Sequence, residues 1–231
     1  MLLLWDIDGT LLTTARSGIG AWEEALHELT GVRTDLSTFD TAGHPDYLIA
    51  GRLLTERAGT DSAGALVASL VRRYEQLLPA ALRRREGGVL PNVRSILEHL
   101  ESQPSVRSML LTGNTRRGAA AKLAHYGLDR FFEEGAFSDA PCERGEIARA
   151  AMAVARARGW ASEGSGVVVI GDTPHDVHCG RSIGARTIAV ATGAYDAAAL
   201  RRHQPWLVLQ QLPPAEAFLR LISGAEVPTD V

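Results

Sequence analysis

Four short, largely apolar runs constrain the fold of this chain more than any other feature. Each run is too short for a stable helix and ends at or just before an aspartate, a threonine or a glycine; they are Leu2–Trp5, Val106–Thr112, Val167–Ile170 and Thr187–Ala191. Such runs are typical of parallel strands that are buried on both faces. We therefore expect these four segments to pair in one parallel sheet, with a weaker strand candidate at Gly135–Ser138.

Stretches with helical patterns lie between these runs. Each is followed by a glycine, the residue that helix C-caps favour; they are Thr115–Tyr126, Glu143–Arg158 and Pro174–Ile183. Strands that alternate with capped helices of this length predict an α/β fold. We therefore expect a Rossmann-like, doubly wound parallel sheet.

The spacing of the runs predicts an insertion after the first strand. About a hundred residues separate the first run from the second, whereas a crossover between parallel strands needs only ~12. The intervening patterns are helical, at Ile19–Leu29, Pro45–Ala58 and Ala63–Arg85. We expect these helices to form a helical cap domain at residues 15–87, from which the chain returns to the core at Gly87-Gly88. The catalytic core then consists of residues 1–14 and 88–231. The segment 88–231 should begin with a core helix at Pro91–Glu101.

Composition excludes several classes of partner. The 231 residues carry 24 basic and 27 acidic side chains, a net charge of −3, which argues against a nucleic-acid-binding surface. No apolar run approaches the ~20 residues that span a bilayer, and the N-terminus lacks the features of a signal peptide. We expect a cytoplasmic protein with no membrane partner, a monomer or homodimer, whose two cysteines are free thiols.

Two pairs of aspartates follow predicted strands. Asp6 and Asp8 come directly after the first strand, and Asp172 and Asp176 come after the third. Because ligands of open α/β sheets bind at the carboxyl ends of the strands, these side chains should meet there. Clustered carboxylates repel one another unless a cation neutralises them, and oxygen ligands suit Mg²⁺. The four aspartates therefore predict a magnesium site.

The end of the second strand carries groups suited to an anion. Thr112, Gly113 and Asn114 offer a hydroxyl and backbone N–H groups at the start of a helix, where phosphates commonly bind. Magnesium held by carboxylates usually shares its coordination with a substrate phosphate. We therefore expect the substrate to be a small phosphorylated metabolite.

These motifs, in their order and spacing, resemble those of the haloacid dehalogenase superfamily. The helical insertion resembles the cap of phosphoglycolate phosphatase-like hydrolases. The resemblance implies that Asp6 attacks phosphorus and that Asp8 protonates the leaving oxygen and then activates water. It further implies that Mg²⁺ is held by Asp6, the backbone carbonyl of Asp8, Asp172 and Asp176, the last directly or through water.

The superfamily usually places a lysine before the last motif, where this chain has Arg144. Arg144 is therefore the expected phosphate-binding cation, with Arg116 as the alternative. Lys122, the single lysine, falls in mid-helix at a spacing typical of a surface position, and no role is assigned to it. His44 stands at the start of a cap helix and would face the substrate in a closed cap, although an ordinary helix N-terminus explains it equally well.

The predicted function is hydrolysis of a phosphate monoester, such as phosphoglycolate or a sugar phosphate, with Mg²⁺. A phosphomutase of the same superfamily is the main alternative, and a non-catalytic binding protein is another. A receiver-type signalling module would also gather aspartates at strand ends, but receivers are about half as long and lack a helical insertion.

Overall fold

A six-stranded parallel sheet forms the centre of the computed structural model, which describes residues 1–60, 64–161 and 166–224. The strands are β1 (Leu2–Trp5), β4 (Arg107–Leu111), β5 (Gly135–Ala136), β6 (Val167–Gly171), β7 (Arg186–Val190) and β8 (Leu207–Leu209). Their spatial order is β5-β4-β1-β6-β7-β8. In order along the chain this is 3-2-1-4-5-6, the order of a doubly wound sheet. The predicted Rossmann-like α/β fold is confirmed.

Helices cover both faces of the sheet because the side chains of each strand alternate between the faces. Leu3 and Trp5 pack with α4 (Val93–Glu101), α5 (Arg116–Tyr126) and α9 (Ala215–Ser223). Leu2 and Leu4 pack on the opposite face with α6 (Arg144–Ala157) and α7 (Pro174–Ser182). A short helix, α8 (Ala197–Arg201), packs beside β8, and a 3₁₀ turn at Asp129–Phe131 follows α5.

The predicted strands and core helices match the observed elements to within a few residues at each end. The weak candidate at Gly135–Ser138 is a two-residue strand, β5. The patterns predict no element beyond residue 191, yet α8, β8 and α9 lie there. Strand β8 has only three residues, too few for a periodic signal, and its position is set by pairing with β7.

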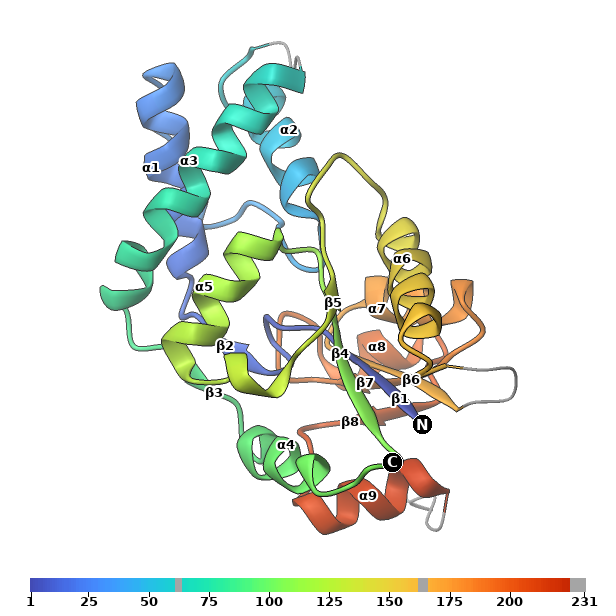
Figure 1. Cartoon of the computed structure of the whole chain (residues 1–231). Coiled ribbons are helices and arrows are strands. Elements are labelled where there is room, and N and C mark those ends of the chain that lie inside the picture. Colours follow the sequence, from blue (N-terminus) through green and yellow to red (C-terminus); the bar gives the residue numbers. More distant parts are fainter. Residues whose placement is uncertain (61–63, 162–165, 225–231) are drawn as a thin grey trace.

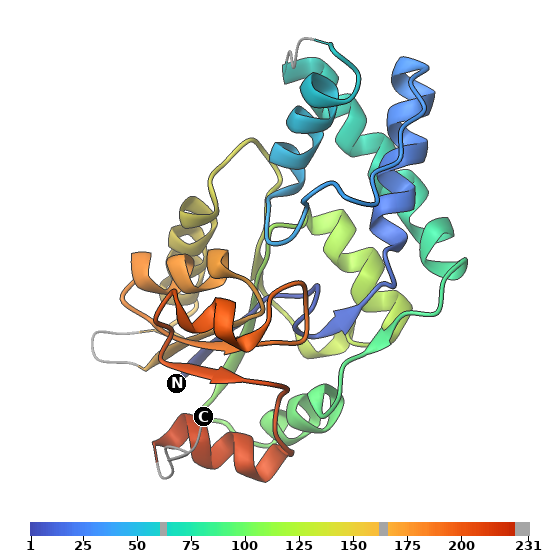
Figure 2. The same cartoon turned by 180° about the vertical axis from the view of Figure 1, so that it is seen from behind.

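A helical insertion, residues 17–83, separates β1 from β4. It contains α1 (Ser17–Thr30), α2 (Asp46–Glu56) and α3 (Gly64–Arg83), and its described residues form no strand. Ala63, the predicted start of the third helix, lies outside the described residues. The three helices bury a hydrophobic cluster of their own, built around residues such as Trp22, Leu53 and Tyr74. Figures 1 and 2 show this insertion at one end of the molecule and α9 at the opposite end.

Two antiparallel strands join the helical insertion to the sheet. They are β2 (Leu12–Thr13) and β3 (Gly88–Val89), paired through Leu12 with Val89 and Thr13 with Gly88. Gly87 is pressed against this pair: a Cβ there would lie 2.2 Å from the Thr13 carbonyl oxygen and 2.1 Å from the Tyr126 hydroxyl. Only glycine leaves room for the two connecting segments, which carry β2 and β3, to lie so close.

No helix in the described part of the chain is long and apolar enough to cross a membrane.

We expect Gly87→Ala to lower the free energy of unfolding by about 1 to 3 kcal/mol, because the new methyl group must displace a backbone carbonyl. Gly88→Ala is the matched control, since no atom lies within 4 Å of its added Cβ. Urea unfolding of both variants measures the effect. Equal stability of the two variants would contradict the assigned close contact.

Candidate active site

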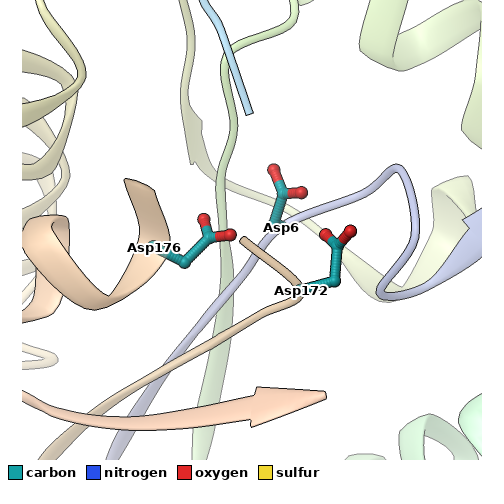
Figure 3. Close-up of side chains that lie close together, drawn as sticks. All are labelled: Asp6, Asp172 and Asp176. Atoms are coloured by element: carbon teal, nitrogen blue, oxygen red, sulfur yellow. The ribbon is translucent and has the colours of Figure 1, made fainter. Parts of the chain in front are cut away.

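Three buried carboxylates meet at the carboxyl ends of two neighbouring strands. Asp6 follows β1, and Asp172 and Asp176 follow β6, which pairs with β1. One oxygen atom from each lies within 4.8 Å of the other two. Figure 3 shows the three side chains gathered at these strand ends. The sheet order therefore brings together residues that lie more than 160 positions apart in the sequence.

Burial and mutual repulsion disfavour the ionised forms of these carboxylates. Burial raises the pKa of Asp6 to about 7, and the negative charges of Asp176 and Asp8 add to this rise, whereas Arg144 opposes it. Burial also raises the pKa of Asp172 well above its usual value, with added repulsion from Asp6 and Asp176. A cation in this position would relieve the repulsion.

The donor set fits a magnesium ion. Asp6 Oδ2 and Asp172 Oδ2 accept no hydrogen bond from the described residues, and both side chains line a cavity. The two oxygens of Asp176 are engaged, Oδ1 by Arg144 and Oδ2 by the backbone N–H and hydroxyl of Thr173. When ionised, three carboxylates face one guanidinium, which leaves two negative charges for a hard divalent cation to balance.

Glycines leave the space that Asp172 occupies. Gly9 has a φ of +78°, and a Cβ there would lie 2.3 Å from Asp172 Oδ2. A Cβ on Gly193 would lie only 1.7 Å from the same oxygen. Asp172 also accepts a hydrogen bond of 3.2 Å from the Thr10 hydroxyl. The glycine of the Asp6-to-Thr10 motif is therefore needed for close approach as well as for its turn.

Arg144, the first residue of α6, is the cation that contacts Asp6. Its Nη2 donates to Asp6 Oδ1 at 3.1 Å and also to Asp176 Oδ1. Arg116, the alternative, has a side chain that is 63% exposed and pairs with Asp139. Of these two arginines, Arg144 is thus the one that the fold places beside Asp6.

Lys122 is buried, so its predicted surface position is wrong. It is 5% exposed on α5, and its Nζ donates to Asp8 Oδ2 and to Asn114 Oδ1, both at 2.6 Å. The spacing of Gly118, Ala119 and Lys122 places all three on the buried face of α5. That spacing was the signal in the sequence that could have indicated the burial of Lys122. A lysine on a buried helix face needs a partner.

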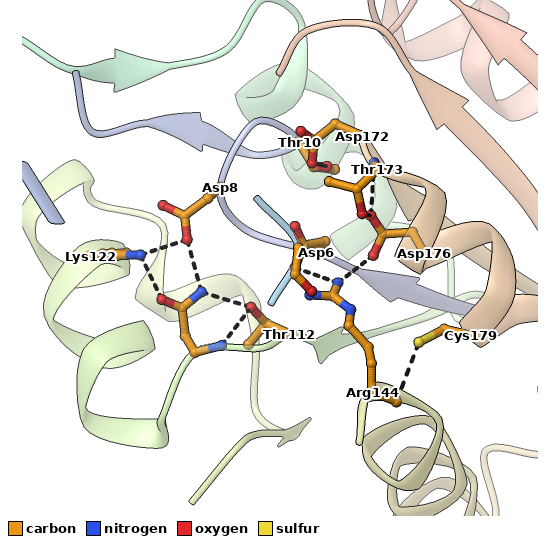
Figure 4. A network of polar contacts seen from close by, with 12 residues as sticks. Asp6, Asp8, Thr10, Thr112, Lys122, Arg144, Asp172, Thr173, Asp176 and Cys179 are labelled. Atoms are coloured by element: carbon orange, nitrogen blue, oxygen red, sulfur yellow. Dashed lines mark hydrogen bonds and ion pairs between the residues drawn. The ribbon is translucent and has the colours of Figure 1, made fainter. Parts of the chain in front are cut away.

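Thr112 and Asn114 extend the polar network around Asp8. Asn114 Nδ2 donates to Asp8 Oδ2 at 2.9 Å and to Thr112 Oγ1 at 2.8 Å. Thr112 Oγ1 also accepts from the Asn114 backbone N–H, so its own proton is free to be donated. The Gly113 N–H donates to no described residue. Figure 4 shows this network beside the cluster of Asp6, Asp172 and Asp176.

The helical insertion contacts the core at this network. Arg144 Nη1 donates to the Gly43 carbonyl at 3.0 Å. The Asp46 N–H donates to the Gly113 carbonyl at 2.8 Å, and Asp46 Oδ2 accepts from the Thr115 N–H at 2.7 Å. A Cβ on Gly113 would lie 2.7 Å from the His44 carbonyl oxygen. Segment 43–46 therefore packs directly on the loop that follows β4.

A cavity of about 540 Å³ lies between the helical insertion and the strand ends. The predicted site residues Asp6, Asp8, Thr112, Gly113, Asn114, Arg144, Asp172 and His44 all line it, and so does Lys122. Asp176 lies behind Arg144 and is not part of the lining. Burial lowers the pKa of His44, which lies 3.7 Å from Asp40.

A family model of haloacid dehalogenase-like hydrolases matches residues 3–181. The match spans the carboxylate cluster, the loop after β4 and the helical insertion. The chain belongs to this family. The order of the motifs along the chain is the one on which the sequence resemblance rests, and their convergence at the carboxyl ends of the strands was expected from the positions of the aspartates.

Solved structures share the fold at low sequence identity. A predicted phosphatase from Clostridium acetobutylicum matches with a TM-score of 0.74 at 17% identity, covering 96% of this chain and 98% of that one. A predicted phosphoglycolate phosphatase from Haemophilus somnus gives 0.72 at 16%, covering 97% of both chains. A candidate beta-phosphoglucomutase from Bacteroides vulgatus gives 0.71 at 17%, covering 97% of this chain and 89% of that one. None of the curated proteins matches the chain significantly.

The buried carboxyl of Asp46 predicts a pH-dependent stability. Burial raises its pKa to about 7 from an ordinary value of 3.8, although Lys122 and the Thr115 N–H oppose the rise. The folded state therefore holds a proton that the unfolded state releases, so this group loses stability as the pH rises from about 4 to about 7. Asp46→Asn removes the titration, and the amide oxygen can still accept from Thr115.

We expect Asp46→Asn to gain a few kcal/mol relative to the unmodified protein between pH 5 and pH 8. Urea unfolding of both proteins at each pH, with a chelator present, measures this difference. The other raised carboxyls are present in both proteins and cancel. A difference that does not change with pH would show that Asp46 is ionised throughout.

Proposed function

We propose that this chain is a Mg²⁺-dependent phosphatase that hydrolyses a small phosphorylated metabolite through an aspartyl-phosphate on Asp6. The observation that carries the proposal is that Asp6 and Asp8, two carboxylates in different surroundings, line the same cavity. Asp6 is buried beside Arg144, while the side chain of Asp8 is 41% exposed and is held by Lys122. Family membership and structural neighbours described as phosphatases support the same reaction.

In the first step, one carboxylate oxygen of Asp6 attacks phosphorus and the bond from phosphorus to the ester oxygen breaks. Asp8 gives its proton to the departing oxygen, so that the alcohol leaves neutral. In the second step, Asp8 takes a proton from water, which attacks the phosphoryl group and releases inorganic phosphate and free Asp6. Lys122 and Asn114 both bind Oδ2 of Asp8, which leaves Oδ1 to exchange the proton.

The phosphoryl oxygens would bind to donors that the described residues leave available. These are the Thr112 hydroxyl, the Gly113 N–H and the guanidinium of Arg144, with Asn114 orienting Thr112. The positive charge of Arg144 lies beside Asp6, since its Nη2 donates to Asp6 Oδ1 at 3.1 Å. A cation and preorganised N–H groups stabilise the charge that develops on a transferring phosphoryl group.

Magnesium would be held by Asp6, Asp172 and the backbone carbonyl of Asp8, with Asp176 sharing its oxygens or acting through water. When bound, it supplies positive charge to the phosphoryl oxygens and offsets the repulsion between the carboxylates. The protein residues orient the reacting groups around it.

The helical insertion would act as a cap domain, residues 15–87, over a core of residues 1–14 and 88–231. Segment 43–46 of the insertion contacts both Arg144 and the loop that follows β4, through Gly113. Movement of the cap away from the core would therefore disturb the site. A closed cap excludes bulk water during the first step and restricts the substrate to small molecules.

We expect phosphate release to require Mg²⁺ and to fall at least about a thousandfold in Asp6→Asn, which lacks the nucleophile. Asp129→Asn, an exposed aspartate outside the cavity lining, is the matched control. Colorimetric phosphate release and circular dichroism of each variant measure activity and fold. Substantial turnover by folded Asp6→Asn would exclude this nucleophile, and isomerised sugar phosphate in place of free phosphate would favour a phosphomutase.

Lys122→Met should slow esters of poor leaving groups by about 10- to 100-fold, because it removes the cation that holds Asp8. Ethyl phosphate needs a proton on its leaving oxygen, whereas p-nitrophenyl phosphate leaves readily without one. The loss should therefore be larger for ethyl phosphate. His125→Ala, an exposed change on the same helix, is the control, and equal losses on both esters would mean that Lys122 does not act through Asp8.

A further inference from the structure

Asp46 is a buried residue of the helical insertion that the proposed mechanism does not use. It is the first residue of α2 and is 4% exposed. Its backbone N–H is one of the donors that the start of a helix leaves unpaired, and it donates to the Gly113 carbonyl at 2.8 Å. Its Oδ2 accepts from the Thr115 N–H at 2.7 Å. Asp46 therefore contacts the loop after β4 with both its backbone and its side chain.

These two hydrogen bonds hold the backbone on either side of Asn114. The Gly113 carbonyl belongs to the planar peptide unit that precedes the Asn114 Cα atom, and the Thr115 N–H belongs to the unit that follows it. Holding both units restrains φ and ψ of Asn114, and with them the direction of its Cα–Cβ bond. From the core, the Ser138 N–H donates to the Asn114 carbonyl at 2.9 Å. The insertion and the core thus orient Asn114 together.

The side chain of Asn114 lies at the centre of the network around Asp8. Its Nδ2 donates to Asp8 Oδ2 at 2.9 Å and to Thr112 Oγ1 at 2.8 Å. Its Oδ1 accepts from Lys122 Nζ at 2.6 Å, and the same ammonium group donates to Asp8 Oδ2. Figure 4 shows Asp8, Lys122 and Thr112 joined in this network. A rotation of the Asn114 side chain would therefore disturb the groups that hold Asp8.

The contact with Thr115 does not require a charge on Asp46. A neutral carboxyl group can carry its proton on Oδ1 and still accept a hydrogen bond at Oδ2, and the amide oxygen of an asparagine can accept in the same way. The variant Asp46→Asn therefore keeps both hydrogen bonds to the loop. Asp46→Ala keeps the backbone N–H that donates to Gly113 but removes the acceptor for the Thr115 N–H.

We propose that Asp46 is a positioning residue for the acid–base chemistry of Asp8, on which it acts through the backbone of Asn114. The helical insertion then does more than enclose the substrate, because its contact with the loop after β4 orders the groups that hold the proton donor. An insertion that moves away from the core takes both hydrogen bonds with it, so proton transfer is efficient only with the insertion in place. The inference rests on the proposed phosphatase for its chemistry and on these hydrogen bonds for the positioning.

Steady-state hydrolysis of ethyl phosphate and p-nitrophenyl phosphate tests the effect on proton transfer. We expect Asp46→Ala to lower kcat for ethyl phosphate by about 10- to 100-fold, with a loss at least about fivefold smaller for p-nitrophenyl phosphate, whose leaving group needs no proton. Asp46→Asn should restore most of the lost rate. Leu48→Ala, a change at a residue 45% exposed on the same helix, is the control and should leave both rates unchanged. Equal losses on the two esters, or a loss as large in Asp46→Asn, would overturn the proposal.

A second measurement decides the positioning without turnover. The side-chain amide protons of Asn114 give a pair of nuclear magnetic resonance signals in the whole chain, identified by their absence in Asn114→Ser. We expect these protons to exchange with solvent at least about tenfold faster in Asp46→Ala, because the restraint on the backbone is lost. Exchange in Asp46→Asn and Leu48→Ala should stay close to that of the unmodified protein.

Unchanged exchange in Asp46→Ala, with its fold verified by circular dichroism, would overturn the proposal. Asp46→Ser, whose hydroxyl stops one bond short of the Oδ2 position, takes the place of Asp46→Ala if that variant does not fold. Faster exchange together with no hydrolysis of any ester by the unmodified protein would support the positioning and contradict the phosphatase.

Discussion

The repulsion among Asp6, Asp172 and Asp176 is the constraint on which the site depends. Each carboxylate is buried, and an unpaired buried charge costs several kcal/mol. Arg144 offsets part of this cost by forming ion pairs with Asp6 and Asp176. The charge that remains favours a bound divalent cation, so the feature that strains the metal-free protein is the one that would bind the metal.

Arg144 also links this cluster to the helical insertion. The same guanidinium that pairs with Asp6 donates to the Gly43 carbonyl, and Asp46 bonds to the loop that binds phosphate in our proposal. The position of the insertion and the geometry around Asp6 are therefore coupled through short, direct contacts. A lysine in place of Arg144 has one nitrogen and could not hold all three partners in the same planar arrangement.

Lys122 shows where pattern reasoning fails. Its position in mid-helix is typical of an exposed lysine, but the helix face that carries it turns toward the site, where Asp8 and Asn114 supply its partners. Such partners lie 114 and 8 residues away, and a pattern within one helix contains no information about the first of them. The same reason explains β8, a three-residue strand that exists because β7 offers an unpaired edge.

Local signals in the sequence determined four strands of the sheet, the alternation of strands and helices up to residue 191, the helical insertion and the aspartates at the strand ends, because each depends on residues close together in the chain. The tertiary structure alone decided which cation meets which carboxylate. It also decided that Lys122 is buried and that its ammonium group meets Asp8 and Asn114. Contacts between distant segments depend on how the insertion packs over the sheet, and that packing is a property of the whole fold.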